Sequence, residues 1–213
     1  MIQVKSFTFN PFMEKTYLLV DDESREAAVI DAGMNSEVEN HEFKSYLDEK
    51  EIVLRYHLLT HAHVDHVLGS EFVLNEYAIY PEMHKDGLPI LEQTEHFVNV
   101  YGLNPVNVIL PKKFLNEGDK IRLGASVLKV LYTPGHADGS ICLVDSVRKF
   151  VVTGDVLFKD SIGRTDLPTG DFDLLMHSIK EKLFGLGDEY LVYPGHGGST
   201  NIGYEKVNNP FII

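Results

Sequence analysis

His61-Ala62-His63-Val64-Asp65-His66 directly follows an apolar segment, residues 52–60, that we expect to form a strand. In an extended turn, residues two apart point the same way, so His61 and His63 can bind one metal ion together. The aspartate and the last histidine of the run lie further along the loop and can face a second ion. Imidazole nitrogens and carboxylate oxygens suit zinc, and they also suit iron or manganese. The run therefore predicts a metal centre.

One loop cannot enclose two metal ions, so we expect further ligands at the ends of other strands. Three turns each follow a predicted strand and end in a metal-binding side chain: Pro134-Gly135-His136, Gly154-Asp155 and Pro194-Gly195-His196. Proline and glycine favour tight turns, and the carboxyl ends of strands are where α/β architectures place their sites. Together with the first run, these turns supply a full set of ligands for two metal ions, with one carboxylate able to bridge them.

The composition is that of a globular protein. Hydrophobic residues make up 44% and charged residues 24% of the chain, which excludes a disordered or fibrous protein. The net charge of −13 argues against nucleic acid, because a phosphate backbone attracts basic surfaces. No apolar run approaches the ~20 residues of a membrane span, and the N-terminus shows no signal-peptide pattern. We therefore expect a cytoplasmic protein that acts on a small molecule, with neither nucleic acid nor membrane as a partner.

Strands and helices alternate along the whole chain, and no linker divides it. The predicted strands cover residues 2–9, 16–20, 27–30, 52–60, 78–80, 126–132, 140–144, 150–153 and 190–193. The predicted helices cover residues 35–50, 67–77, 91–101 and 171–183. Asp171 is the expected N-cap of the last helix, and residues 158–170 are expected to form a loop. The single Cys142 lies within a strand and is expected to be a buried apolar residue, since it can form no internal disulfide.

The chain resembles the metallo-β-lactamase superfamily, and within it the small glyoxalase II-like hydrolases. The motifs that carry the resemblance extend over almost the whole length: Ile30-Asp31-Ala32-Gly33, Thr60–His66, Thr133-Pro134-Gly135-His136, Gly154-Asp155 and Pro194-Gly195-His196. The resemblance implies an α/β fold of four layers, an αββα sandwich with the metal site at one edge between the two sheets. It also implies a single domain over residues 1–213.

The same resemblance implies how the ligands divide between two metal ions, expected to be Zn²⁺ with iron or manganese as alternatives. The first ion would be bound by His61, His63 and His136. The second ion would be bound by Asp65, His66 and His196. Asp155 would bridge the two ions, and Asp31 would hold the histidine loop in place without binding metal itself, as residues around a metal site often do.

The resemblance further implies a hydrolase in which a hydroxide held between the two ions attacks a carbonyl. Asp65 and Asp155 would be the catalytic carboxylates. The expected substrate is a thioester, such as an S-2-hydroxyacyl glutathione, because a thiolate is a weakly basic leaving group. The β-lactamases themselves usually have cysteine or serine where Asp155 stands, so antibiotic hydrolysis is disfavoured.

Substrate recognition is expected in the loop after the bridging carboxylate. Lys159 and Arg164 lie there, and either could bind a carboxylate of glutathione or of another thiol carrier. A pair between Arg164 and Asp166 within the loop is the alternative interpretation of that arginine. Glyoxalase II enzymes typically grip glutathione partly through a C-terminal helical domain. Residues 197–213 are too few to form one.

A different enzyme class remains open on the same motifs. Persulfide dioxygenases share this fold but bind one iron, using the equivalents of His61, His136 and Asp155, and they oxidise glutathione persulfide with molecular oxygen. The two hypotheses predict different metal contents, about two zinc ions per chain for the hydrolase and about one iron for the dioxygenase.

Overall fold

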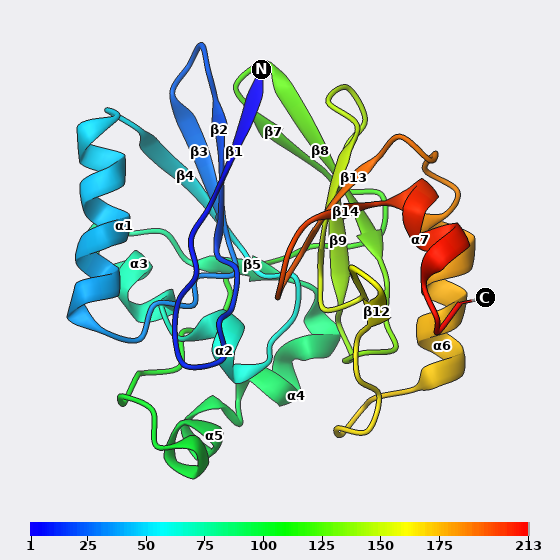
Figure 1. Cartoon of the computed structure of the whole chain (residues 1–213). Coiled ribbons are helices and arrows are strands. Elements are labelled where there is room, and N and C mark those ends of the chain that lie inside the picture. Colours follow the sequence, from blue (N-terminus) through cyan, green and yellow to red (C-terminus); the bar gives the residue numbers. More distant parts are fainter. Residues whose placement is uncertain (213) are drawn as a thin grey trace.

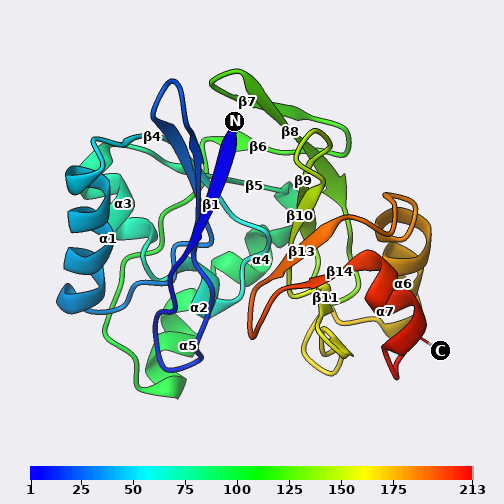
Figure 2. The same cartoon turned by 45° about the horizontal axis from the view of Figure 1, so that its top comes forward.

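Two six-stranded sheets face each other, and helices cover the outer face of each sheet (Figure 1). The computed structural model describes residues 1–212. Helices α1 (Glu37–Glu49) and α3 (Ser70–Tyr77) cover the first sheet, and α6 (Phe172–His177) and α7 (Ile202–Asn208) cover the second (Figures 1 and 2). This is the αββα sandwich that the sequence predicts.

The first sheet comes from the N-terminal half of the chain. Its strands in spatial order are β1 (Ile2–Ser6), β2 (Tyr17–Asp21), β3 (Glu26–Ile30), β4 (Val53–Leu58), β5 (Pro81–Met83) and β6 (Lys113–Phe114). The first three strands form an antiparallel meander, and β3 to β6 run parallel. The parallel connections carry the helices, because a parallel strand needs a long crossover to return.

The second sheet comes from the C-terminal half. Its strands in spatial order are β14 (Thr200–Asn201), β13 (Leu191–Pro194), β10 (Phe150–Gly154), β9 (Ile141–Asp145), β8 (Ser126–Tyr132) and β7 (Lys120–Leu123). Only β10 and β13 are parallel. A small hairpin, β11 (Leu157–Phe158) and β12 (Ser161–Ile162), follows β10. It lies at the start of the stretch predicted to be a loop.

The remaining helices are short. They are α2 (Val64–Val67), α4 (Leu88–Leu91), α5 (Thr94–Tyr101), a 3₁₀ turn (Lys85–Gly87) and a π-helical segment (Ser178–Leu183) that continues α6. Asp171 caps α6 as predicted, because its side chain accepts a hydrogen bond from the backbone N–H of Leu174. Within residues 1–212, each helix falls short of the length and apolar character that crossing a bilayer requires.

Alternation along the central strands builds separate cores on the two faces of each sheet. In β9, Ile141 and Leu143 pack between the two sheets, while Cys142 and Val144 pack against the helical layer. This is the period of two that places successive strand residues on opposite faces. Cys142 is fully buried, as predicted for an apolar residue within a strand.

Two helical predictions merge elements that the structure separates. The predicted helix 67–77 is interrupted at Gly69, whose N–H donates to the carbonyl of Ala32 (2.7 Å) rather than to the preceding turn. A Cβ at Gly69 would lie 2.9 Å from that carbonyl oxygen, so only glycine allows this approach. The predicted helix 91–101 is likewise split, and α5 begins only at Thr94.

The predicted strand at residues 78–80 is wrong. Ala78 ends α3 in the left-handed conformation (φ 57°), so the chain turns there instead of extending. The strand begins instead at Pro81, just after the predicted range. Proline lacks an N–H but is tolerated as the first residue of a strand.

Candidate metal centre

The metal centre lies at one end of the sandwich, at the carboxyl ends of four strands. The loop after β4 carries the histidine run, and the turns after β8, β10 and β13 carry His136, Asp155 and His196. His63 precedes the first turn of α2, so Asp65 and His66 lie on that helical turn. All seven side chains predicted as metal ligands therefore meet at one edge between the two sheets.

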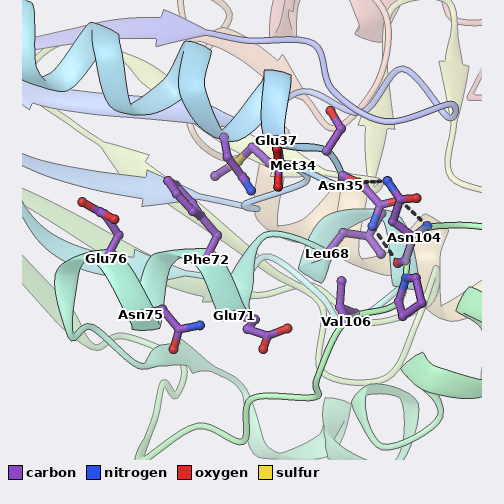
Figure 3. Close-up of a pocket in the computed structure, with 13 residues that line it drawn as sticks. Met34, Asn35, Glu37, Leu68, Glu71, Phe72, Asn75, Glu76, Asn104 and Val106 are labelled. Atoms are coloured by element: carbon purple, nitrogen blue, oxygen red, sulfur yellow. Dashed lines mark hydrogen bonds between the residues drawn. The ribbon is translucent and has the colours of Figure 1, made fainter.

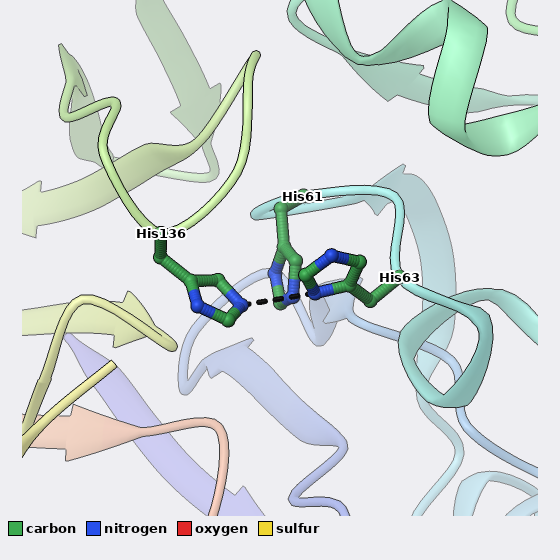
Figure 4. A group of neighbouring side chains, drawn as sticks. All are labelled: His61, His63 and His136. Atoms are coloured by element: carbon green, nitrogen blue, oxygen red, sulfur yellow. Dashed lines mark hydrogen bonds between the residues drawn. The ribbon is translucent and has the colours of Figure 1, made fainter. Parts of the chain in front are cut away.

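Three histidines form the first cluster. The Nε2 atom of His136 lies 2.9 Å from Nδ1 of His63 (Figure 4). The centre of the His61 ring lies 4.8 Å from that of His63 and 4.9 Å from that of His136. One nitrogen from each ring lies within 4.8 Å of the others. Two nitrogens that each bind one zinc ion at ~2.0–2.1 Å stand about 3.3 Å apart in a tetrahedral site. The cluster thus has the spacing of a metal site.

Asp65, His66 and His196 form the second cluster, again with one ligand atom each within 4.8 Å of the others. Oδ2 of Asp65 lies 3.1 Å from Nε2 of His196 and 3.5 Å from Nε2 of His66. Burial opposes the charge on Asp65, but His66 and the hydrogen bond with His196 outweigh burial and lower its pKa. Asp65 is therefore ionised at neutral pH, the form in which a carboxylate binds metal.

Asp155 lies between the two clusters. Its Oδ2 atom is 3.6 Å from Nε2 of His136 in the first cluster and 3.6 Å from Nε2 of His196 in the second. Its Oδ1 atom is 3.6 Å from Nε2 of His66. The neighbouring Gly195 has no Cβ, and one built there would lie 2.2 Å from Oδ1 of Asp155. The glycine of the Pro-Gly-His turn therefore makes room for this carboxylate.

Hydrogen bonds fix the orientation of most of these imidazoles. The Nδ1 atoms of His136 and His196 donate to the backbone carbonyls of Arg164 (2.8 Å) and Phe12 (3.1 Å). Because a carbonyl can only accept, each ring has its proton on Nδ1 and turns the lone pair of Nε2 toward the centre. The side chain of Asp31 does the same for His66, at 3.1 Å from Nδ1.

In the first cluster, the protonation states also suit metal binding. Burial, followed by the charge of His66, lowers the pKa of His63 to about 4, and burial and His63 lower that of His136 to about 3. Burial raises the pKa of Asp155 to about 6. Neutral imidazole is the form that binds metal, so the first cluster is ready to act as a ligand set at neutral pH.

Unpartnered polar atoms support the same assignment. Among residues 1–212, the buried Nε2 atoms of His61 and His66 and the buried Oδ1 of Asp155 have no hydrogen-bond partner. Leaving a buried polar group unpaired costs about 1–3 kcal/mol each, which is rarely tolerated in one small region without compensation. These atoms and their spacing fit two divalent metal ions.

Asp31 holds the histidine loop. Its Oδ1 accepts from the N–H of Thr60 (2.6 Å), and its Oδ2 accepts from the hydroxyl of Thr60 (2.6 Å) and from His66. The side chains of Asp31, His61 and His66 also lie close enough to form a third metal-binding group. We do not assign that group a metal, because Asp31 already accepts three hydrogen bonds.

We expect Asp31→Asn to weaken metal binding about 10- to 100-fold, the usual effect of losing a residue that orients a ligand. Asparagine tolerates the left-handed backbone at this position (φ 53°). Its NH₂ group would, however, replace a carboxylate oxygen that accepts from Thr60 or His66, so two donors would face each other. Competition with a metal-chelating dye measures the change. Unchanged metal affinity with normal folding would show that Asp31 does not orient His66.

Sequence reasoning missed two buried residues beside the second cluster, Asn10 and Glu14. The Glu14 side chain is fully buried, with Oε1 4.0 Å from Nδ1 of His66. Burial raises the pKa of Glu14 well above its ordinary value. Its other oxygen lies 2.9 Å from the hydroxyl of Thr16, whose single hydrogen faces the carbonyl of Asp31 (2.6 Å). A protonated Glu14 can donate to Thr16, which satisfies both contacts.

The two predicted substrate-binding residues have exposed side chains. Lys159 lies in the turn between β11 and β12. The guanidinium of Arg164 forms two hydrogen bonds of 2.7 Å with the carboxylate of Asp166, which is the alternative considered for this arginine. The backbone carbonyl of Arg164 accepts from His136, so this residue borders the first cluster.

A separate cavity of about 530 Å³ lies between α1 and α3 (Figure 3). Asn35 and Asn104 border one side of it and are joined by three hydrogen bonds. The residues that line this cavity include none of the seven predicted ligands. It is therefore distinct from the metal centre.

Known proteins are similar to this chain in sequence and architecture. The family model of the Metallo-beta-lactamase superfamily matches residues 10–196. The hydroxyacylglutathione hydrolase GloC of Haemophilus influenzae is 36% identical over 205 residues, which cover 94% of this chain and 93% of that protein. The structure of TTHA1623 in a di-iron-bound form is 33% identical with a TM-score of 0.86, over 97% of this chain and 99% of that one. The B3 metallo-beta-lactamase BLEG-1 is 30% identical with a TM-score of 0.85, over 99% of both chains. The chain therefore belongs to the metallo-beta-lactamase superfamily, and is a metallo-hydrolase with a divalent-metal site.

Proposed function

We propose that the protein hydrolyses thioesters at a centre of two divalent metal ions. His61, His63 and His136 bind one ion. Asp65, His66 and His196 bind the other. Asp155 bridges the two. The observation that carries this proposal is the position of Asp155, which lies 3.6 Å from histidines of both clusters.

Two divalent ions at this position supply a Lewis acid for the substrate carbonyl and lower the pKa of a bound water to near neutrality. The seven ligand side chains named above would hold the two ions in place for that chemistry. Asp65 and Asp155 are the carboxylates that face the centre, and they can receive the proton of the attacking water. Cys142 offers no competing nucleophile, because burial raises the pKa of its thiol to about 12.

The proposed substrate is an S-2-hydroxyacyl glutathione. Support comes from GloC, which is named a hydroxyacylglutathione hydrolase and matches 94% of this chain. Aromatic residues border the second cluster: the ring centres of Phe158 and His196 are 6.3 Å apart. The carbonyl of Phe12 accepts from His196, and the ring of Phe12 packs edge-on against that of Tyr101 at 5.2 Å. Lys159 and Arg164 are exposed basic groups that can pair with the carboxylates of the thiol carrier.

The direct test compares hydrolysis of S-lactoylglutathione with that of thioesters carrying other thiols, using protein purified with its own metal. We expect release of free thiol from S-lactoylglutathione at a rate well above that from simple acyl thioesters. No thioester hydrolysis, together with oxygen uptake on glutathione persulfide, would instead identify a dioxygenase.

We expect Arg164→Gln to raise KM for the glutathione thioester about tenfold, because a hydrogen bond to a charged group contributes about 1.5–3 kcal/mol. The value of kcat should stay near that of the wild type, since the guanidinium of Arg164 is hydrogen-bonded to Asp166 and to none of the seven predicted ligands. Asp166→Asn is the matched control, because it weakens the pairing of the Arg164 guanidinium with residue 166 and leaves the positive charge of Arg164 in place. A fall in kcat with unchanged KM in Arg164→Gln would contradict a role in binding.

A further inference from the structure

Residues 10–16, here called the N-terminal strap, are part of the connection between β1 and β2 and pass along the second cluster. Asn10 is 8% exposed, and its side-chain amide donates to the backbone carbonyls of Gly33 and Asp65, both at 2.9 Å. A ligand of the second cluster is thus tied, through its own carbonyl, to a residue 55 positions earlier in the chain.

The strap also holds His196. The carbonyl of Phe12 accepts from Nδ1 of His196 (3.1 Å), which fixes the ring. The backbone of Glu14 pairs with that of His196 in an isolated β-bridge, and the N–H of Lys15 donates to the carbonyl of Gly195 (2.8 Å). Both the ring and the backbone of this ligand are therefore positioned by the strap.

The third ligand of the cluster, His66, packs against the Glu14 side chain. Oε1 of Glu14 is 4.0 Å from Nδ1 of His66, and both side chains are fully buried. The opposite side of this carboxyl is closed by Gly33, where a Cβ would lie only 2.0 Å from Oε2. Glu14 thus fills the space behind the ring.

The first cluster is held by other parts of the chain. His136 donates to the carbonyl of Arg164, and Nδ1 of His61 lies 3.1 Å from the hydroxyl of Thr60. Within residues 1–212, the strap forms no hydrogen bond or ion pair with His61, His63 or His136. The strap therefore contacts every ligand of one cluster and leaves the other to different elements.

From this asymmetry we propose that the N-terminal strap selectively orders the second metal subsite, with Asn10 as its positioning residue. The proposal rests on the two-metal assignment made above. Loss of the Asn10 amide releases the backbone of Asp65, so binding of the second ion weakens while binding of the first ion is retained.

The test is a count of zinc ions bound per chain at a series of buffered free zinc concentrations. Asn10→Gly accommodates the positive φ of residue 10 (51°) and removes the amide. Asn10→Asp keeps the oxygen that accepts from the N–H of Phe12 (3.0 Å) but lacks the donor. In both variants we expect the second binding step to weaken at least about tenfold, the scale of losing a residue that orients a ligand. The first step should be unchanged.

A second Asn-Pro-Phe turn in this chain provides the matched control. Asn209 is fully buried, accepts from the N–H of Phe211 (3.1 Å) and donates to the carbonyl of Ser161 (3.0 Å). Asn209→Gly should lower the melting temperature while both zinc ions still bind with wild-type affinity.

Three results would overturn the proposal. They are wild-type zinc binding in both folded Asn10 variants, an equal loss of both ions, or the same selective loss in Asn209→Gly. A wild-type chain that binds only one ion would instead overturn the two-metal assignment itself, so the two failures are distinguishable.

Discussion

Asp155→Asn is expected to lower the rate of thioester hydrolysis at least about a thousandfold. The amide offers one oxygen where the carboxylate offers two, so it cannot bind both ions, and it removes a negative charge that offsets theirs. Metal polarisation of a carbonyl contributes several kcal/mol to the barrier, and about 1.4 kcal/mol corresponds to a tenfold change in rate. Since Asp155 lies 3.6 Å from histidines of both clusters, we expect both ions to bind more weakly.

Steady-state kinetics and a zinc count on the same preparation measure these two effects. Asp145→Asn is a suitable control, because Asp145 is also a buried carboxylate in the second sheet, but it is the last residue of β9 and accepts hydrogen bonds from the turn that follows. It should affect stability and leave metal content unchanged. If Asp155→Asn kept two tightly bound ions and its activity, the bridging role would be refuted.

His61→Ala is expected to abolish turnover by a different route, through loss of the first ion alone. The Nε2 atom of His61 is buried and has no partner among residues 1–212, so its removal takes a ligand from a cluster of three. The second cluster does not include His61 in its ligand set and should retain its ion. We therefore expect about one zinc ion per chain and a rate at least about a thousandfold lower.

His177→Ala serves as the control, because His177 is exposed on α6 in the outer helical layer. It should have wild-type activity and metal content. An unchanged rate in His61→Ala would mean that the first ion is wrongly placed, and loss of both ions would mean that the clusters are not independent.

The clustering of the seven side chains could be predicted because each lies in a loop or turn that comes after a strand and is marked by its neighbours in the sequence. His136 and His196 each follow Pro-Gly, and the structure shows why one of these glycines is needed: a Cβ at Gly195 would meet Asp155. Such local signals can be found in one sequence. The αββα sandwich followed from the family resemblance that the same motifs carry.

The residues that hold the ligands were harder to predict, because their partners are remote in the sequence. Asn10 contacts the carbonyl of Asp65 across 55 residues, and a polar side chain before a proline signals only a turn. Glu14 is an ionisable residue in an otherwise ordinary segment, and only the fold shows that it is fully buried. The sequence pattern also does not distinguish a substrate-binding arginine from one paired within its own loop. In the structure, the guanidinium of Arg164 is paired with Asp166.

The metal content of active protein tests the central claim most directly. The protein should be purified without added metal, and its ions counted by mass spectrometry alongside thioester hydrolysis before and after chelation. Our account predicts about two divalent ions per chain, with hydrolysis lost on chelation and restored by adding the metal back. One iron per chain, with oxygen consumption on glutathione persulfide and no thioester hydrolysis, would contradict it.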